Sequence, residues 1–358
     1  MRYPTPPLQR IPQLDAIRGL AILVVIFHNQ AGKFPSLHLE RVFANGWMGV
    51  DLFFVLSGFL ITGILLDTKG SEGFFKNFYV RRCLRIWPLY FAVITFMFVV
   101  VPLVRPTQAQ SVFERSSPWW SFPLFLQNFF VPNLTRAAAS LGVTWSLAIE
   151  EQFYLVWPWV VRCCSAIQLR WFALSVFLLS PALRLFLSGQ GVDLYTNTFC
   201  RLDGLMAGAL LALLVRSANF VPSRFVRGAA ITLFVAAPLA FVLEAFHARW
   251  IVFTLTALAS VAFVYLVVYS RAGWLQRVAS NRFLVYTGVI SYGLYLLHKL
   301  PFDIAEALHF DRYPAVAAPL LLVATFGLAA VSWVCLERPI LKLKRRFESK
   351  PQIATHEV

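Results

Sequence analysis

Continuous apolar segments, each about as long as a membrane-spanning helix, dominate the chain. Crossing a hydrocarbon core of about 30 Å takes roughly 20 helical residues. About ten segments approach that length, at roughly 14–34, 47–66, 84–104, 145–162, 170–188, 199–216, 226–244, 250–270, 283–302 and 314–336. Their apolar residues are contiguous rather than alternating, which favours helices over the strands of a β-barrel. The pattern predicts an all-α polytopic membrane protein with about ten transmembrane helices.

Composition supports this prediction. Hydrophobic residues make up 59% of the 358 residues and charged residues 14%, whereas a soluble domain carries roughly a quarter charged residues. The net charge of +15 would suggest a nucleic-acid partner in a soluble protein. Here the cations lie in short clusters between apolar segments, and no zinc-finger, recognition-helix or RNA-binding motif occurs. We therefore expect a membrane protein that binds no nucleic acid.

The distribution of Lys and Arg predicts the orientation. Alternate connections are rich in these residues, notably near Arg81 and after Arg338, while the intervening connections carry fewer. By the positive-inside rule, both termini are expected in the cytoplasm. We expect a single transmembrane domain over 1–346 and a disordered cytoplasmic tail over 347–358. The aromatic-rich outer connection 105–144 is expected to dip into the membrane interface or to cover a cavity.

Ionisable residues within apolar segments are costly in a membrane and are therefore candidates for function. One set lies toward the predicted cytoplasmic face and comprises Asp15, Arg18, Arg81, Arg82 and Arg85. Arg82 and Arg85 are three residues apart and share a helix face. Guanidinium groups there suit a phosphate-bearing ligand, through paired hydrogen bonds. Two other interpretations stay open, namely a topology signal and, for Arg18, an ion pair with Asp15.

A second set lies toward the opposite face and comprises His28, Asp51, Glu150, Glu151 and His298. His28 is about 15 Å beyond Arg18 along one helix and faces roughly the same side. Glu150 and Tyr154 share a helix face, and Tyr295 joins His298 in a polar stripe. An imidazole with a carboxylate can take a proton from a hydroxyl group. The alternative is a satisfied polar network that holds helices together.

Six motifs, in order, resemble acyltransferase family 3, a family of integral-membrane O-acyltransferases. They are Leu14–Ala21 leading to His28, Gly49–Gly58, Phe78–Tyr90, Trp145–Tyr154, Ile290–His298 and Glu337–Pro339. The likeness runs from about residue 12 to 346 and agrees with about ten spans.

The resemblance implies transfer of an acetyl or other short acyl group from cytoplasmic acyl-coenzyme A to a hydroxyl of an extracytoplasmic polysaccharide or glycolipid. It implies that His28 is the essential histidine and that the cluster of Arg81, Arg82 and Arg85 binds the donor. An integral protein of a bacterial inner membrane is expected.

We combine this resemblance with the two sets of ionisable residues. We then predict catalytic roles for His28, Asp51 and Glu150, and donor binding by Arg18 together with the cluster of Arg81, Arg82 and Arg85. Acceptor binding is predicted for Glu151, Tyr154, Tyr295 and His298.

No metal is expected, because no pair of the five cysteines has metal-ligand spacing. A rival interpretation is a transporter, whose pathway would also contain ionisable residues. It is weakened by the absence of an inverted repeat in the span pattern.

Overall fold

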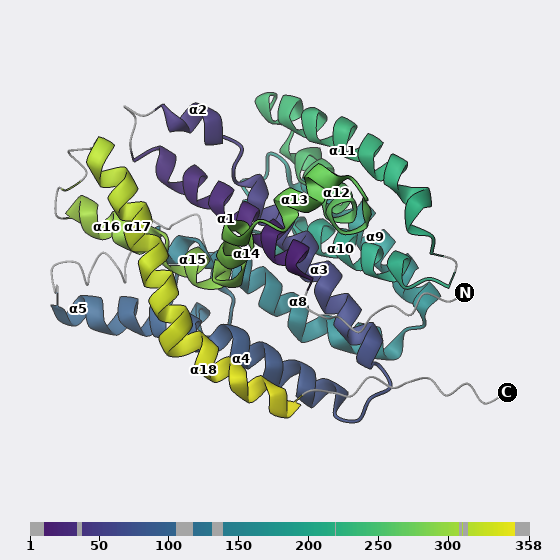
Figure 1. Cartoon of the computed structure of the whole chain (residues 1–358), viewed down its shortest axis with the longest axis horizontal. Helices are drawn as coiled ribbons and strands as arrows, with labels where there is room; N and C mark the ends of the chain where they lie inside the picture. The colour runs from purple at the N-terminus through teal and green to yellow at the C-terminus, as the bar shows by residue number, and fades with distance from the viewer. Residues whose placement is uncertain are drawn as a thin grey trace.

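The computed structural model describes residues 11–33, 38–104, 117–130, 139–218, 220–307, 310 and 314–347, and over these residues it contains helices and turns without a β-strand. The α-helices are α1 (Pro12–Ala31), α2 (Leu39–Phe43), α3 (Met48–Thr68), α4 (Phe74–Thr95), α5 (Val101–Val104), α7 (Ala139–Gly142), α8 (Thr144–Cys163), α9 (Ala166–Leu187), α10 (Leu202–Val215), α11 (Pro222–Ala245), α12 (Arg249–Tyr269), α13 (Gly273–Ala279), α14 (Arg282–Val289), α15 (Ser291–Leu297), α16 (Lys299–Ala307), α17 (Pro314–Ser332) and α18 (Arg338–Leu343) (Figure 1). Short π-helical turns (Phe96–Val100, Trp333–Glu337) and 3₁₀ turns (Trp119–Ser121, Gln127–Phe129, Thr198–Cys200, Lys344–Phe347) complete the set. The predicted all-α class is confirmed. The predicted tail falls, after Phe347, outside the described residues.

Within the described residues, seven helical stretches are long and apolar enough to cross a membrane. They are α1, Leu39–Thr68, Phe74–Val104, α9, α11, α12 and Ala315–Leu343. Two further predicted segments are also helical. One is α8, which carries Glu150, Glu151 and Arg162, and the other is α10, which has only 14 residues. The described residues therefore support seven of the about ten predicted spans. The cytoplasmic location of both termini remains a prediction.

The prediction of one continuous helix over 283–302 is wrong. The structure divides this segment into α14, α15 and α16. Pro301 explains the second break, because its ring lacks the N–H that would bond the Leu297 carbonyl and collides with that carbonyl in a continuing helix. α15 indeed ends at Leu297. Near the first break, a Cβ on Gly288 would lie 1.7 Å from the Asp15 carbonyl oxygen, so α14 presses backbone to backbone against α1.

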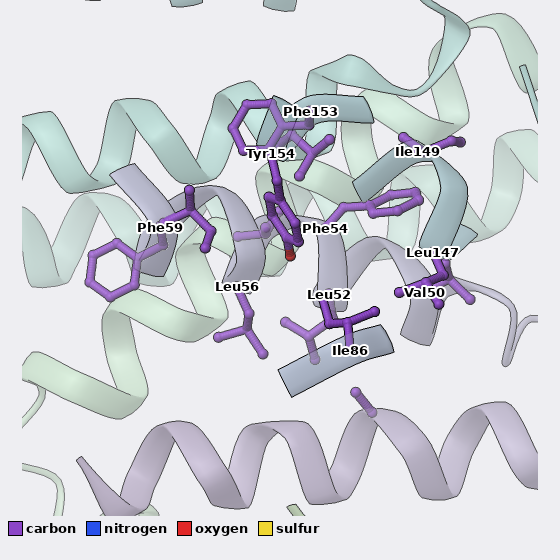
Figure 2. Packing of buried hydrophobic residues seen from close by; sticks show 14 of the residues in the cluster. Val50, Leu52, Phe54, Leu56, Phe59, Ile86, Leu147, Ile149, Phe153 and Tyr154 are labelled. Carbon is purple, nitrogen blue, oxygen red and sulfur yellow. The ribbon is translucent and has the colours of Figure 1, made fainter. Parts of the chain in front are cut away.

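The interior of the protein is formed largely by α3, α8, α10 and α12, whose helices approach closely. A Cβ on Gly208 of α10 would lie 2.1 Å from the Val55 carbonyl oxygen of α3. Small residues at such crossings allow the dispersion contacts that hold helices together in lipid. Figure 2 shows the adjoining apolar cluster, in which Val50 and Phe54 of α3 lie among Leu147 and Ile149 of α8 and Ile86 of α4.

The outward faces of α9, α11 and α17 are apolar. Phe186, Phe234 and Val323 are 70%, 81% and 69% exposed. A soluble protein rarely leaves so many large apolar side chains uncovered, whereas lipid tails cover them at no cost. The exposed belt therefore supports an integral membrane protein, independently of the hydropathy pattern.

The described part of the 105–144 connection packs against α4. Phe122 and Phe125 are buried, the Tyr90 hydroxyl donates to the Phe122 carbonyl at 2.9 Å, and the Gln127 amide donates to the Thr144 carbonyl at 3.0 Å. Residues 117–130 are therefore an ordered part of the bundle. Residues 105–116 and 131–138 lie outside the described residues, so the predicted placement of the whole connection is not tested.

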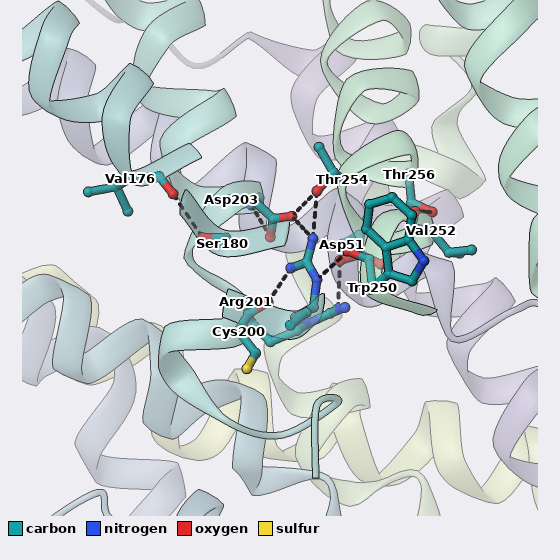
Figure 3. A network of polar contacts seen from close by, with 12 residues as sticks. Asp51, Val176, Ser180, Cys200, Arg201, Asp203, Trp250, Val252, Thr254 and Thr256 are labelled. Atoms are coloured by element: carbon teal, nitrogen blue, oxygen red, sulfur yellow. Dashed lines mark hydrogen bonds and ion pairs between the residues drawn. The ribbon is translucent and has the colours of Figure 1, made fainter. Parts of the chain in front are cut away.

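Two buried ion pairs join α3, α9, α10 and α12 (Figure 3). Arg184 donates to Asp203 at 2.8 Å and to Thr254 at 2.5 Å, and Arg201 donates to Asp51 at 2.6 Å. Both arginine side chains are fully buried. Removing one partner would leave a buried charge uncompensated, so each pair ties its helices to one arrangement.

Asp203→Ala is therefore expected to lower the free energy of unfolding by about 3–5 kcal/mol. The matched control is Asp67→Ala, because Asp67 is 40% exposed in its pair with Arg216, and such a pair contributes about 0–1 kcal/mol. Thermal unfolding of the detergent-purified proteins, followed by size-exclusion fluorescence, measures both. An equal change in the two variants would contradict the structural role of the buried pair.

Candidate functional site

His28 lies in the last turn of α1, where α2 fixes the orientation of its ring. Its Nδ1 is 2.8 Å from the carbonyl oxygen of Phe43, and Phe43 stacks on Phe27 with ring centroids 4.8 Å apart. A carbonyl oxygen only accepts hydrogen bonds, so Nδ1 is the donor and the neutral ring carries its free lone pair on Nε2. The imidazole is thus held in the tautomer that can accept a proton at Nε2.

His28 lines a cavity of about 520 Å³, which we name the histidine cavity. Asn29, Trp47, Tyr195 and Lys299 lie in the same wall. The Tyr195 ring packs 4.6 Å from that of Trp145 and 6.0 Å from that of Trp47, centroid to centroid. Aromatic faces with a few convergent amide, hydroxyl and ammonium groups are typical of a site for a polar organic ligand.

Sequence reasoning missed Tyr195 and Lys299. Tyr195 lies in the turn before α10, and its place depends on Trp47 and Trp145, which come from distant parts of the chain. Lys299 follows directly on His298, within a segment that was expected to be one helix. Its place in the wall depends on the break at Leu297.

The predicted basic cluster lines a second cavity of about 470 Å³, which we name the arginine cavity. Arg18 comes from α1, Arg81, Arg82 and Arg85 from α4, and Lys344 from the turn after α18. Helix α18 and the residues before it pack against α4 (Figure 1). The first turns of α1 and the end of α18 therefore line the same cavity.

Acidic partners neutralise only part of this positive charge. Arg18 pairs with Asp15 at 3.4 Å, which is the alternative that the sequence left open beside donor binding, and Arg85 lies 3.7 Å from Glu337. Among the described residues, Arg81 and Arg82 have no acidic partner within 4 Å. Instead, the Arg82 guanidinium lies 5.5 Å from the centre of the Tyr154 ring. Two unpaired guanidinium groups at a cavity wall favour a bound anion.

Glu150 lies at the wall of the arginine cavity beside Ser57 and Tyr154. Its carboxylate accepts from the Ser57 hydroxyl at 2.6 Å and from the Tyr154 hydroxyl at 3.0 Å. Glu151 faces another way, accepts from the Trp87 indole at 3.1 Å and lines neither cavity. The structure therefore places Glu150 and Tyr154 in the lining of the arginine cavity, whereas Glu151 is not part of that lining.

Val50 and Tyr295 line both cavities and form the wall between them. The Tyr295 hydroxyl donates to the Val143 carbonyl at 2.8 Å and lies 2.5 Å from the Ser146 hydroxyl, which then donates to it. Both partners belong to the α8 region, so the ring is held across the boundary by two hydrogen bonds.

Asp51 and His298 are buried and line neither of the two cavities. Asp51 is 2% exposed and pairs with Arg201, whose guanidinium sits 3.9 Å from the centre of the Phe253 ring. His298 is fully buried. Its Nδ1 is 2.8 Å from the Tyr295 carbonyl and its Nε2 is 3.2 Å from the Asn29 amide. Both ring nitrogens are thus engaged, and neither residue faces a cavity.

Among the described residues, no group of three or more His, Cys, Asp or Glu side chains is placed to hold a metal ion.

The family model and the similar proteins that match this chain are all named as acyltransferases. Residues 11–336 match the family model described as "Acyltransferase domain". The chain is 30% identical, over 93% of its length, to a peptidoglycan O-acetyltransferase of Listeria monocytogenes. It is 30% identical, over 95%, to a Bacillus subtilis protein provisionally named a peptidoglycan O-acetyltransferase. The matches cover 56% of each of these two relatives, so the chain spans little more than half their length. No solved structure matches it significantly.

Proposed function

The chain belongs to the acyltransferase family whose model matches residues 11–336, and from that premise we propose that it is a membrane O-acyltransferase. It moves an acetyl or other short acyl group from cytoplasmic acyl-coenzyme A to a hydroxyl of an extracytoplasmic polysaccharide or glycolipid. The observation that carries the proposal is the pair of cavities, one basic and one containing His28, on the two sides of the Val50–Tyr295 wall.

The arginine cavity is the donor site in this proposal. The phosphate groups of coenzyme A lie against Arg81, Arg82 and Arg85, where guanidinium groups bind phosphate oxygens in pairs. The pantetheine arm follows apolar wall residues such as Phe53 and Leu60 toward Tyr295. The thioester then reaches the boundary of the histidine cavity without crossing bulk water.

The histidine cavity receives the acceptor hydroxyl. His28 Nε2 takes the hydroxyl proton as the oxygen attacks the thioester carbonyl carbon. The C–S bond breaks, the sulfur leaves as the thiolate of coenzyme A, and the imidazolium returns the proton to it. The acceptor becomes an O-acyl ester, and charge and protons balance.

The partner that orients His28 in this mechanism is the Phe43 carbonyl rather than a carboxylate. Asp51 and Glu150 have other partners, Arg201 and the Ser57–Tyr154 pair. We assign Asp51 a supporting role, because Arg201 lies 5.3 Å from the centre of the Tyr195 ring and 5.9 Å from that of Trp145. Glu150 and Tyr154 line the path of the donor arm.

Names of the relatives suggest the acceptor class. One relative is a peptidoglycan O-acetyltransferase, so a cell-wall glycan is the first acceptor to test. The aromatic and amide groups of the histidine cavity are compatible with a sugar. Because the chain spans little more than half of that relative, we propose the acceptor as a class and not as a particular polymer.

Inverted membrane vesicles from cells that make the protein provide the direct test. Labelled acetyl-coenzyme A is added outside, on the former cytoplasmic face, and alkali-labile label is measured in the glycan and glycolipid fractions. Label in either fraction that depends on the protein supports the proposal. Label that enters the vesicles without becoming covalently attached would support the transporter instead.

His28→Asn should lower this labelling by about 10²–10⁴-fold, the usual contribution of a general base. The asparagine amide can still donate to the Phe43 carbonyl but offers no basic nitrogen in place of Nε2. His247→Asn, at an exposed position, is the matched control and should label normally. Normal labelling by the His28 variant would remove this residue from the mechanism.

Arg82→Gln should raise the KM for acetyl-coenzyme A by about tenfold or more, since a charge-assisted phosphate contact contributes about 1.5–3 kcal/mol. The KM for the acceptor should change little. Arg162→Gln, an exposed substitution on α8, controls for the loss of one positive charge. Equal effects of the two substitutions would contradict a specific donor site.

Gly46→Ala tests the placement of His28. A Cβ there would lie 2.6 Å from the His28 Cβ and 2.7 Å from the Val24 carbonyl oxygen, so the imidazole or the chain beside it must shift. Displacement of a reacting group by about 1 Å can cost about 10²-fold in rate, so we expect a lower kcat with little change in the donor KM. Gly32→Ala, where a Cβ meets nothing within 4 Å, should be neutral. A Gly46 variant with a normal kcat would show that the position of His28 is unimportant.

A further inference from the structure

Lys344 is a basic residue of the arginine cavity that lies just beyond the last apolar stretch of the chain. It starts the helical turn after α18, beyond the apolar stretch that ends at Leu343, and its side chain lines the cavity. Sequence reasoning placed it among the charges of the cytoplasmic end and gave it no role. The fold brings it next to α4, because its turn packs against that helix.

Four positive groups from α4 and α1 act on Lys344. Arg81, Arg82 and Arg85 face it from α4, and Arg18 faces it from α1. The nearby acids are already engaged, since Asp15 pairs with Arg18 and Glu337 lies beside Arg85. Among the described side chains, none forms a hydrogen bond or an ion pair with Lys344.

Burial and these four positive neighbours lower the pKa of Lys344 to about 7. Near neutral pH the amine is therefore protonated only part of the time. A bound polyanion reverses the electrostatics, because it neutralises the arginines and attracts the ammonium form directly.

We propose that Lys344 is a further phosphate-binding residue of the arginine cavity, and that it takes up a proton from solution when the phosphate groups of a coenzyme A thioester enter. The proton converts the neutral amine into an ammonium ion, which donates hydrogen bonds to phosphate oxygens. The identity of the ligand rests on the proposed function. The coupling of anion binding to protonation rests on the cluster of cations alone.

The direction of the pH dependence follows from linkage. Below about pH 6 Lys344 is already protonated, so binding takes up almost no proton. As the pH rises through about 7 the free amine loses its proton, and binding must restore it. Uptake then approaches one proton, and the dissociation constant of coenzyme A rises by up to about tenfold per pH unit. The phosphomonoester group of the ligand has a pKa of about 6, so above pH 7.5 it contributes little.

Isothermal titration of coenzyme A into the full chain, in phosphatidylcholine nanodiscs, measures this uptake. Titrations at pH 6, 7.5 and 8.5 in two buffers of different ionisation enthalpy give the number of protons bound per ligand. We expect a value at or below zero at pH 6, where the phosphomonoester group of the ligand releases protons on binding, and a value that rises toward one at pH 8.5.

Two substitutions separate the charge of Lys344 from its titration. Lys344→Arg keeps a cation that stays protonated, so coenzyme A should bind without proton uptake and with a dissociation constant that changes little between pH 7.5 and 8.5. Lys344→Gln should weaken binding at pH 7 by about tenfold and also abolish the uptake. Lys342→Gln, at an exposed position two residues away, should behave like the wild type.

Uptake of the same size in the Lys344→Arg and wild-type proteins would overturn the proposal, as would binding of coenzyme A by the wild type without uptake at pH 8.5. If coenzyme A fails to bind but inorganic pyrophosphate binds with proton uptake, the proposed donor is wrong and the role of Lys344 stands.

Nanodiscs that contain phosphatidylglycerol test the other source of phosphate. Unchanged uptake there supports a free phosphate ligand. Loss of uptake in those discs alone would mean that a lipid headgroup already holds Lys344 protonated, which would overturn its coupling to the donor.

Discussion

A guanidinium group that faces a cavity inside a membrane protein needs an anion, because a charge away from water is costly and arginine does not give up its proton. In this protein Asp15 and Glu337 satisfy the need only for Arg18 and Arg85. Arg81 and Arg82 remain without an acidic partner among the described residues. The same excess of positive charge acts on Lys344, which follows α18 at the end of the chain that the structure describes. The arrangement is most stable when a polyanion fills the cavity, which connects the stability of this end of the bundle to its ligand.

Several other ionisable residues in the described interior already have partners, which favours a structural role for them. Asp51–Arg201 and Asp203–Arg184 are buried pairs that join helices, and His298 has a partner at each ring nitrogen. His28 is different, because only its Nδ1 has a described partner while its ring lies at the wall of a cavity. Between His28 and the arginines lies a boundary made of Val50 and Tyr295. In the proposed reaction only the acyl end of the donor reaches this boundary, while its charged end stays with the arginines.

The sequence predicted features that depend on local pattern. Apolar segments predicted the helices, and the spacing of Arg82 and Arg85 predicted a shared helix face, which agrees with their common place in the arginine cavity. The sequence could not predict features that depend on contacts between distant parts of the chain. The Phe43 carbonyl that orients His28 belongs to the backbone and has no sequence signature, and Tyr195 reaches the site by packing on Trp47 and Trp145. Asp51 was expected to act on chemistry because it lies in an apolar segment, but its partner Arg201 is 150 residues away. Pro301 could have indicated the break after Leu297, since a proline within a helix interrupts it.

The central claim is that a thioester held by the arginine cavity reaches His28 across the boundary at Tyr295. The most direct measurement is a cryo-EM structure of the protein with a non-hydrolysable analogue of acetyl-coenzyme A in which a methylene group replaces the thioester sulfur. The account predicts density for the phosphates beside Arg81 and Arg82 and for the analogue's carbonyl between Val50 and Tyr295, facing Nε2 of His28. Phosphates bound elsewhere, or an arm that ends in a pocket closed off from His28, would contradict it.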